Sequence, residues 1–219
     1  MKVRPILFNG EMVRAILDRR KTQTRRVVKP QPDDVWHESG WKNGGVGMRF
    51  GMEVEGVLCP YGVPGDRLWV RETWAAVMFY EAHVEGFGLG YADDWEGSSH
   101  IPQGPSEYTI LYRADNEWDE SVEDRGFRWR PSIHMPHWAS RITLEVTDVR
   151  VERVQDISEA DAEAEGAPPI LVPPDGGGAP FTEGFMDLWD SINAKRGFGW
   201  DANPWVWVVA FRSVDAVPR

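Results

Sequence analysis

The 219-residue chain has a single cysteine, no long apolar run and no leader-like N-terminus. One thiol, Cys59, cannot form an internal disulfide, which is compatible with a reducing compartment. No apolar stretch approaches the roughly 20 residues needed to cross a bilayer, and the first residues lack the continuous apolar stretch of a signal peptide. The sequence therefore predicts a cytoplasmic protein with no membrane partner.

Tryptophan, in contrast, is abundant. The 42% of hydrophobic and 27% of charged residues are ordinary for a soluble globular protein, whereas 12 Trp exceed what a core alone demands. We therefore expect some of the indoles to line a surface or a cleft. The length is compatible with one domain over residues 1–219, enlarged by insertions.

The charge is unevenly distributed along the chain. The total is -11, but residues 1–30 carry nine basic side chains against Glu11 and Asp18, a net +7, so the remainder carries -18. An acidic body repels a nucleic-acid backbone, and this disfavours non-specific binding of long nucleic acid. Two alternatives stay open: the basic segment binds a short anionic or polar ligand, or it only pairs with acidic residues of the body.

Residue periodicity predicts short strands and a few helices. Strands are expected over residues 3–8, 22–28, 67–74, 108–112, 141–152 and 205–211, and Pro5 confines the first to an edge or entry position. Helices are expected over 10–19, 159–165 and 181–193, the second capped by Ser158 and closed by Gly166. Residues 33–58 indicate an excursion or hairpin, 75–128 a larger insertion, and 168–180 a Pro/Gly loop. This order predicts an α+β fold with a mixed β-barrel rather than an alternating βαβ sheet.

Four blocks of the sequence resemble the ASCH family, which has a PUA-like β-barrel. They are DRRKTQTRR at 18–26, PGDRLWV at 64–70, SEADAEAEG at 158–166, and the closing strand at 205–211. The blocks cover less than half of the chain but span its length. The whole sequence also resembles enlarged ASCH-like proteins of phage and prophage genomes, which implies the host cytoplasm as location. The family usually has glycine at the position of Arg19; if that position is left-handed, arginine costs about 1–2 kcal/mol.

The resemblance implies a candidate catalytic set. One branch of the family comprises small amidohydrolases that remove an acyl group from the exocyclic nitrogen of cytidine with a Lys, a Thr three residues later and a Glu; the matching positions are Lys21, Thr24 and Glu165. Amide hydrolysis needs a nucleophile, a proton acceptor and a donor for the oxyanion. A lysine acts as a base only when burial or a cationic neighbour lowers its pKa from about 10.4. The basic residues that can supply such a neighbour are Arg20, Arg25 and Arg26.

The residues leave open whether the chain is an enzyme. The leading hypothesis is an amidohydrolase acting on N-acylated pyrimidine nucleosides or bases, with no cofactor. The alternative is a non-catalytic protein of phage origin that binds RNA, single-stranded nucleic acid or modified DNA. A small nucleoside or modified base is the expected partner, because an acidic body does not repel it.

Further residues are candidates for ligand binding. Arginine presents a planar fork that suits a phosphate or base edge, although Arg26 can equally pair with Asp66 or Glu72. Indoles stack on bases, but at least two of those considered are expected in the core. The ligand-binding candidates are Arg20, Arg26, Trp69, Glu72, Trp74 and Trp138, with residues 130–138 as a candidate wall of the cleft. No metal is predicted, because His134, His137 and Cys59 lack a zinc-ligand spacing.

Overall fold

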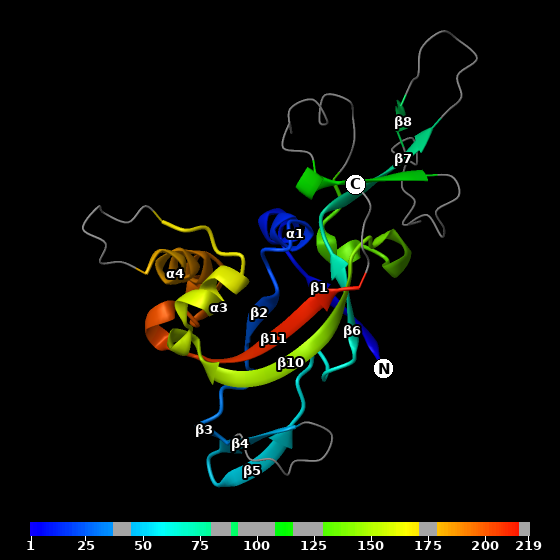
Figure 1. Ribbon diagram of the computed structural model, residues 1–219. Helices are drawn as coiled ribbons and strands as arrows, with labels where there is room; N and C mark the ends of the chain where they lie inside the picture. Colours follow the sequence, from blue (N-terminus) through cyan, green and yellow to red (C-terminus); the bar gives the residue numbers. More distant parts are fainter. Residues whose placement is uncertain (37–44, 80–88, 92–107, 116–128, 171–178, 215–219) are drawn as a thin grey trace, which may run out of the picture. The chain divides into compact units, whose positions relative to one another are not determined.

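The computed structural model describes residues 1–36, 45–79, 89–91, 108–115, 129–170 and 179–214 (Figure 1). The chain divides into two compact units. Unit 1 comprises Met1–Arg4, Ala15–Leu68 and Leu144–Ala216, and unit 2 comprises Pro5–Arg14, Trp69–Thr143 and Val217–Arg219. That the whole chain is one domain with insertions stays a prediction.

The predicted sheet-dominated α+β fold with a few helices is confirmed. The strands are β1 (Val3–Leu7), β2 (Gln23–Val27), β3 (Asp34–Trp36), β4 (Val46–Phe50), β5 (Glu53–Val57), β6 (Arg67–Arg71), β7 (Trp74–Phe79), β8 (Leu89–Tyr91), β9 (Tyr108–Tyr112), β10 (Thr143–Arg153) and β11 (Trp205–Ser213). The α-helices are α1 (Gly10–Leu17), α3 (Glu159–Ala164) and α4 (Pro180–Asn193). Short 3-10 turns include η5 (Ser132–His134), η6 (His137–Ala139) and η8 (Ala194–Arg196). None of the helices described combines the length and the apolar character needed to cross a bilayer.

The largest sheet has five strands in the order β1-β6-β10-β11-β2. The edge position predicted for the first strand from Pro5 is confirmed. In unit 1, β11 runs antiparallel to both β10 and β2, and Val209 lies opposite Thr24. The nearly all-apolar strand β11 lies between β10 and the polar strand β2, and its pairing sets the register of β2.

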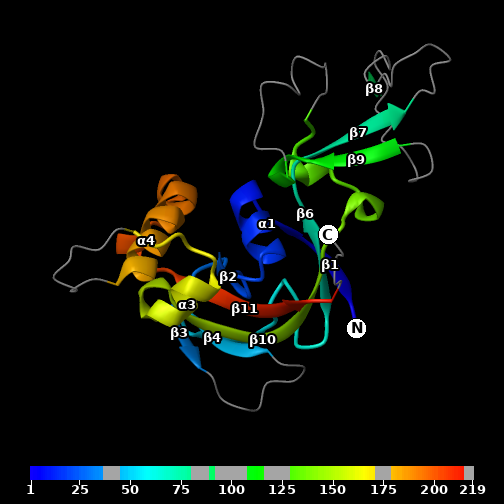
Figure 2. The ribbon, with the colours of Figure 1, turned by 45° about the horizontal axis from the view of Figure 1, so that its top comes forward.

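Helices α3 and α4 pack together beside the strands of unit 1 (Figure 2). Glu159 of α3 accepts hydrogen bonds from the backbone N–H groups of Phe181 and Thr182, which satisfies the first turn of α4. A shared core joins the helices to β11, and its buried residues are Val154, Ile157, Ala162, Ala167, Phe185, Trp189, Val206 and Val208. This core holds α3 in a fixed position relative to the sheet.

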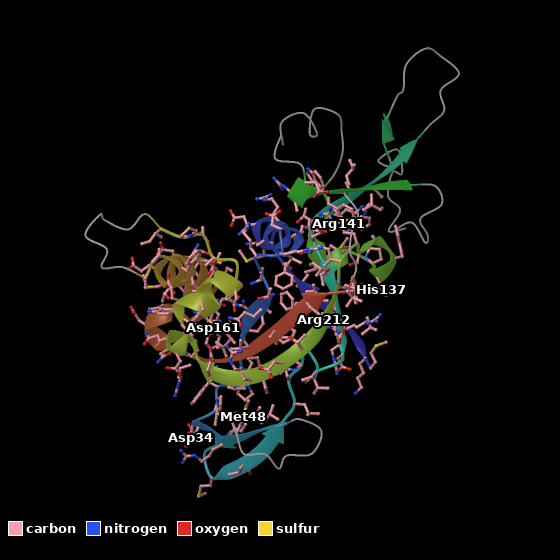
Figure 3. All side chains as sticks on the ribbon, viewed as in Figure 1. Asp34, Met48, His137, Arg141, Asp161 and Arg212 are labelled. Atoms are coloured by element: carbon pink, nitrogen blue, oxygen red, sulfur yellow. The ribbon has the colours of Figure 1, made fainter. Side chains whose placement is uncertain are left out.

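Residues 33–58 form a separate antiparallel sheet in the order β3-β4-β5. Met48 in the middle strand is fully buried, whereas β5 is exposed along almost its whole length (Figure 3). The hairpin predicted for this glycine-rich stretch is therefore confirmed, apart from residues 37–44, which lie outside the described residues.

Unit 2 contains the sheet β8-β7-β9, in which β7 pairs antiparallel with both neighbours. The strand predicted at 108–112 is confirmed, and most of the predicted 75–128 insertion lies outside the described residues. The single strand predicted over 67–74 is wrong in extent: β6 ends at Arg71 and β7 begins at Trp74. At the break, the Glu72 N–H donates to the Met135 sulfur at 3.3 Å instead of continuing a ladder.

Candidate functional site

The turn between α1 and β2 directs Lys21 into the interior of unit 1. Arg19 has a left-handed φ of 62°, and the N–H groups of Arg20 and Lys21 both donate to the Ala15 carbonyl, at 2.8 and 2.9 Å. Such a turn satisfies helix-terminal carbonyls and normally uses glycine. The Lys21 side chain that follows it is only 2% exposed.

The end of α3 approaches this turn closely. The Thr22 N–H donates to the Ala164 carbonyl at 2.8 Å. Gly166 has φ 73°, and a Cβ at this position would lie 2.9 Å from the Ala15 Cβ and 3.1 Å from the Lys21 Cβ. Glycine is required here both for its backbone conformation and for space. The close approach places Glu165 directly against Lys21.

Lys21 and Glu165 form a buried ion pair, although 144 positions separate them in the sequence. The Lys21 Nζ donates to Glu165 Oε2 at 2.8 Å and to the Glu165 backbone carbonyl at 2.6 Å. Burial lowers the pKa of Lys21, Glu165 opposes that shift, and Arg26 and Arg25 add to it. Of the three arginines considered as cationic neighbours of Lys21, Arg25 and Arg26 contribute to lowering its pKa. The exposed Arg20 instead lies 3.3 Å from Asp18.

Arg25 extends the pair into a network that sequence reasoning did not assign to the site. Its Nη1 donates to Glu165 Oε1 at 3.1 Å, and its Nη2 contacts Glu152 and lies 3.6 Å from Asp161. Gln23, two residues earlier, donates to Asp161 at 2.9 Å. The sequence did contain a signal for this contact: Gln23 and Arg25 are two residues apart on β2, so both side chains lie on the face that meets α3.

Thr24 lies on the alternate face of β2 and is 4% exposed. Among the described residues, its hydroxyl makes no hydrogen bond with Lys21 or Glu165. The structure thus joins two of the three predicted catalytic residues, Lys21 and Glu165, and places the third, Thr24, on the neighbouring strand β2. Their catalytic roles stay a prediction.

Arg26 lies two residues after Thr24 on β2 and is half-buried. Its guanidinium carbon lies 6.0 Å from the centroid of the Tyr61 ring. The two acidic partners considered for it are engaged elsewhere: Asp66 accepts from the Lys2 N–H at 2.6 Å and Arg4 at 2.7 Å, and Glu72 binds an arginine of unit 2. Hydrogen bonding to the Lys2 N–H is the main cause that lowers the pKa of Asp66.

Glu72 is a buried member of a bidentate ion pair in unit 2. Arg141 donates to its two carboxylate oxygens at 2.9 and 3.0 Å, and Asp115 and the ring of Tyr112 also contact Arg141 (Figure 3). Burial raises the pKa of Glu72, and Arg141 opposes that shift. Both oxygens are thus engaged within the protein.

The three tryptophans predicted to bind ligand also belong to unit 2. Trp74 is completely buried and meets Trp138 edge-on at 6.1 Å between ring centroids, so Trp74 is core. Trp69 is 8% exposed, with the His137 ring at 5.0 Å and the Arg71 guanidinium at 4.6 Å. Stacking of a base on these indoles stays a prediction.

Within the part of the chain that the structure describes, no group of three or more His, Cys, Asp or Glu side chains could hold a metal ion. Cys59 is buried, and burial raises the pKa of its thiol to about 11. His134 and His137 lie on the separate turns η5 and η6.

No protein-family model and no curated protein matches the chain. Two solved structures are similar to it. One is a protein from Enterococcus faecalis V583 with the family model DUF984, at 10% identity and TM-score 0.41, covering 98% of this chain and 81% of the other. The second is an ASCH domain from Lactobacillus crispatus JV V101, at 11% identity and TM-score 0.40, covering 97% and 80%. Since both TM-scores are below 0.5, residue roles follow from this chain alone.

Proposed function

We propose that this chain is an ASCH-type protein that recognises a nucleobase or nucleoside through unit 1 and hydrolyses the amide of N-acylated pyrimidine nucleosides. The observation that carries the proposal is the buried contact between Lys21 and Glu165 beside the strand that bears Thr24. Buried acid–base pairs of this kind are typical of sites that transfer protons.

The pair can supply both a base and an acid. In the proposed first step, the Lys21 ammonium passes its proton to the Glu165 carboxylate, to which it donates at 2.8 Å, giving a neutral amine and a carboxylic acid. Burial lowers the pKa of Lys21 and so favours loss of that proton. The amine then accepts the Thr24 hydroxyl proton as the oxygen attacks the acyl carbon. The Glu165 acid protonates the exocyclic nitrogen as the carbon–nitrogen bond breaks. Water hydrolyses the resulting threonine ester and releases the carboxylic acid.

A specific observation favours the alternative, a non-catalytic reader of RNA or a modified DNA base. Lys21 closes the C-terminal end of α3 by bonding the Glu165 carbonyl, so the pair also has a structural role. Without substrate, Thr24 has no hydrogen bond to either group among the described residues. Hydrolysis therefore requires that substrate binding bring the Thr24 hydroxyl, which lies on the face of β2 opposite Arg25, within reach of the Lys21 amine, since catalytic hydrogen bonds often tighten only with substrate bound.

The test is turnover of N4-acetylcytidine by the wild type and matched threonine variants. Thr24→Val removes the hydroxyl at nearly constant volume and should lower the rate about a hundredfold or more, whereas Thr24→Ser should retain measurable activity. Thr22→Val is the control, because Thr22 is exposed in the same Lys-Thr-Gln-Thr motif. Melting temperatures establish that each variant is folded.

A wild type that binds nucleoside without releasing acetate would contradict hydrolysis and support the reader. Equal rates for wild type and Thr24→Val would remove Thr24 from the mechanism. The activity of Glu165→Gln must be compared with its melting temperature, because the substitution removes the carboxylate that neutralises the buried Lys21 and Arg25 and can therefore destabilise the fold.

A further inference from the structure

A cluster of basic side chains lies where the end of β2 meets the segment after α4. It consists of Arg26, Lys29 and Arg196, and we name it the Arg26–Arg196 cluster. The Lys29 ammonium lies 5.1 Å from the centroid of the Phe198 ring, which joins the two segments across 169 positions. Both segments belong to unit 1.

The cluster adjoins the proposed catalytic pair. The charges of Glu165 and Arg196 both act on Arg26: burial and the charge of Arg196 lower its pKa, whereas Tyr61 and Glu165 raise it. Arg26 therefore connects the Lys21–Glu165 pair to the exposed Arg196 after α4.

Most arginines of unit 1 have a carboxylate partner. Arg4, Arg25, Arg150 and Arg212 are paired with Asp66, Glu152, Glu152 and Glu145. Within the described part of the chain, Lys29 and Arg196 have no carboxylate at ion-pair distance, although the whole protein has a net charge of -11. Like charges held close together repel, and a bound anion relieves that repulsion.

We propose that the Arg26–Arg196 cluster binds a phosphate monoester, so that the ligand of the adjoining site is a pyrimidine nucleotide rather than a free nucleoside. This inference rests on the proposed function of unit 1. The guanidinium of Arg196 binds phosphate oxygens in a bidentate manner, and Lys29 adds a point charge. Two exposed cations and one half-buried guanidinium match a single phosphate, whereas a polynucleotide needs a longer basic track.

The experiment compares binding of cytidine, cytidine 5′-monophosphate, inorganic phosphate and a short oligocytidylate by titration calorimetry. These ligands carry no acyl group, so binding is measured independently of hydrolysis. The monophosphate should bind about tenfold or more tightly than cytidine. Arg196→Gln should abolish that advantage and leave cytidine affinity unchanged. Arg212→Gln is the control, because Arg212 is exposed and paired with Glu145.

Equal affinity for cytidine and its monophosphate would overturn this inference while leaving nucleoside recognition intact. Absence of binding by every ligand would overturn both the inference and the proposed function. Tighter binding of the oligonucleotide than of the monophosphate, lost in Arg196→Gln, would assign the cluster to a nucleic-acid backbone and also overturn the inference.

Discussion

Arg19→Gly should stabilise the protein, because Arg19 occupies a backbone conformation suited to glycine. Its φ of 62° places the Cβ against the following carbonyl, at a cost of about 1–2 kcal/mol. Glycine removes that cost but gives the unfolded chain more freedom, which offsets about 0.5–1 kcal/mol. The net gain is about 0.5–1 kcal/mol in the free energy of unfolding.

Thermal and urea unfolding measure this gain. For a chain of this size, 1 kcal/mol corresponds to a rise of about 2–4 °C in Tm, so Arg19→Gly should melt about 1–4 °C higher. The urea midpoint should rise without a change in slope. Arg19 is exposed, so loss of its side chain removes no core packing.

Arg20→Gly is the matched control, because Arg20 is the next residue, is also exposed and does not have a positive φ. It should lose about 0.5–1 kcal/mol through the greater flexibility of the unfolded chain. Opposite signs for the two neighbours would locate the effect in the left-handed backbone. A Tm for Arg19→Gly at or below that of the wild type would refute the reasoning.

Three further outcomes follow from buried or crowded groups. Gly166→Ala should lower the free energy of unfolding by about 1–3 kcal/mol, seen as a lower urea midpoint, because the new Cβ meets atoms at 2.9 and 3.1 Å. Asp66 has a lowered pKa, so its contribution is present above about pH 4 and is lost as the pH falls through its folded-state pKa; the Tm difference between wild type and Asp66→Asn should be large at pH 7 and shrink at pH 3. Arg141→Met should destabilise unit 2 by about 3–5 kcal/mol, since Glu72 is then buried without its bidentate partner; a loss no larger than that of Arg212→Met would contradict this.

Local patterns predicted most of the secondary structure. The end of the 159–165 helix at Gly166, the strand at 108–112 and the apolar strand at 205–211 were found because caps and side-chain periodicity are local properties. The break after Arg71 was missed, and at that break Glu72 contacts Met135, 63 positions away in the sequence. No periodicity of the sequence encodes such a contact.

The same distinction applies to the candidate site. Family resemblance proposed Lys21 and Glu165 as partners, and the structure joins them. Arg25 was considered only as a neighbour of Lys21, because its partners lie 127 and 140 positions away. The burial of Trp74 could not be predicted from the sequence either. Its local sequence is compatible with a cleft wall or with the core, and only the packing of the folded chain shows that it is completely buried.

The interaction partners of the basic side chains in residues 1–30 determine which ligands this segment can attract. Lys21 and Arg25 are neutralised inside unit 1 by Glu165 and Glu152, and Arg4 by Asp66. These three pairings reduce the net charge of residues 1–30 from +7 to +4, and the rest of the chain remains strongly acidic. Affinity for long nucleic acid depends on the number of phosphates contacted, so it should be weak and fall steeply with salt. A ligand with a single phosphate depends on far fewer free cations, and Lys29 after β2 and Arg196 after α4 are two cations that have no carboxylate at ion-pair distance among the described residues.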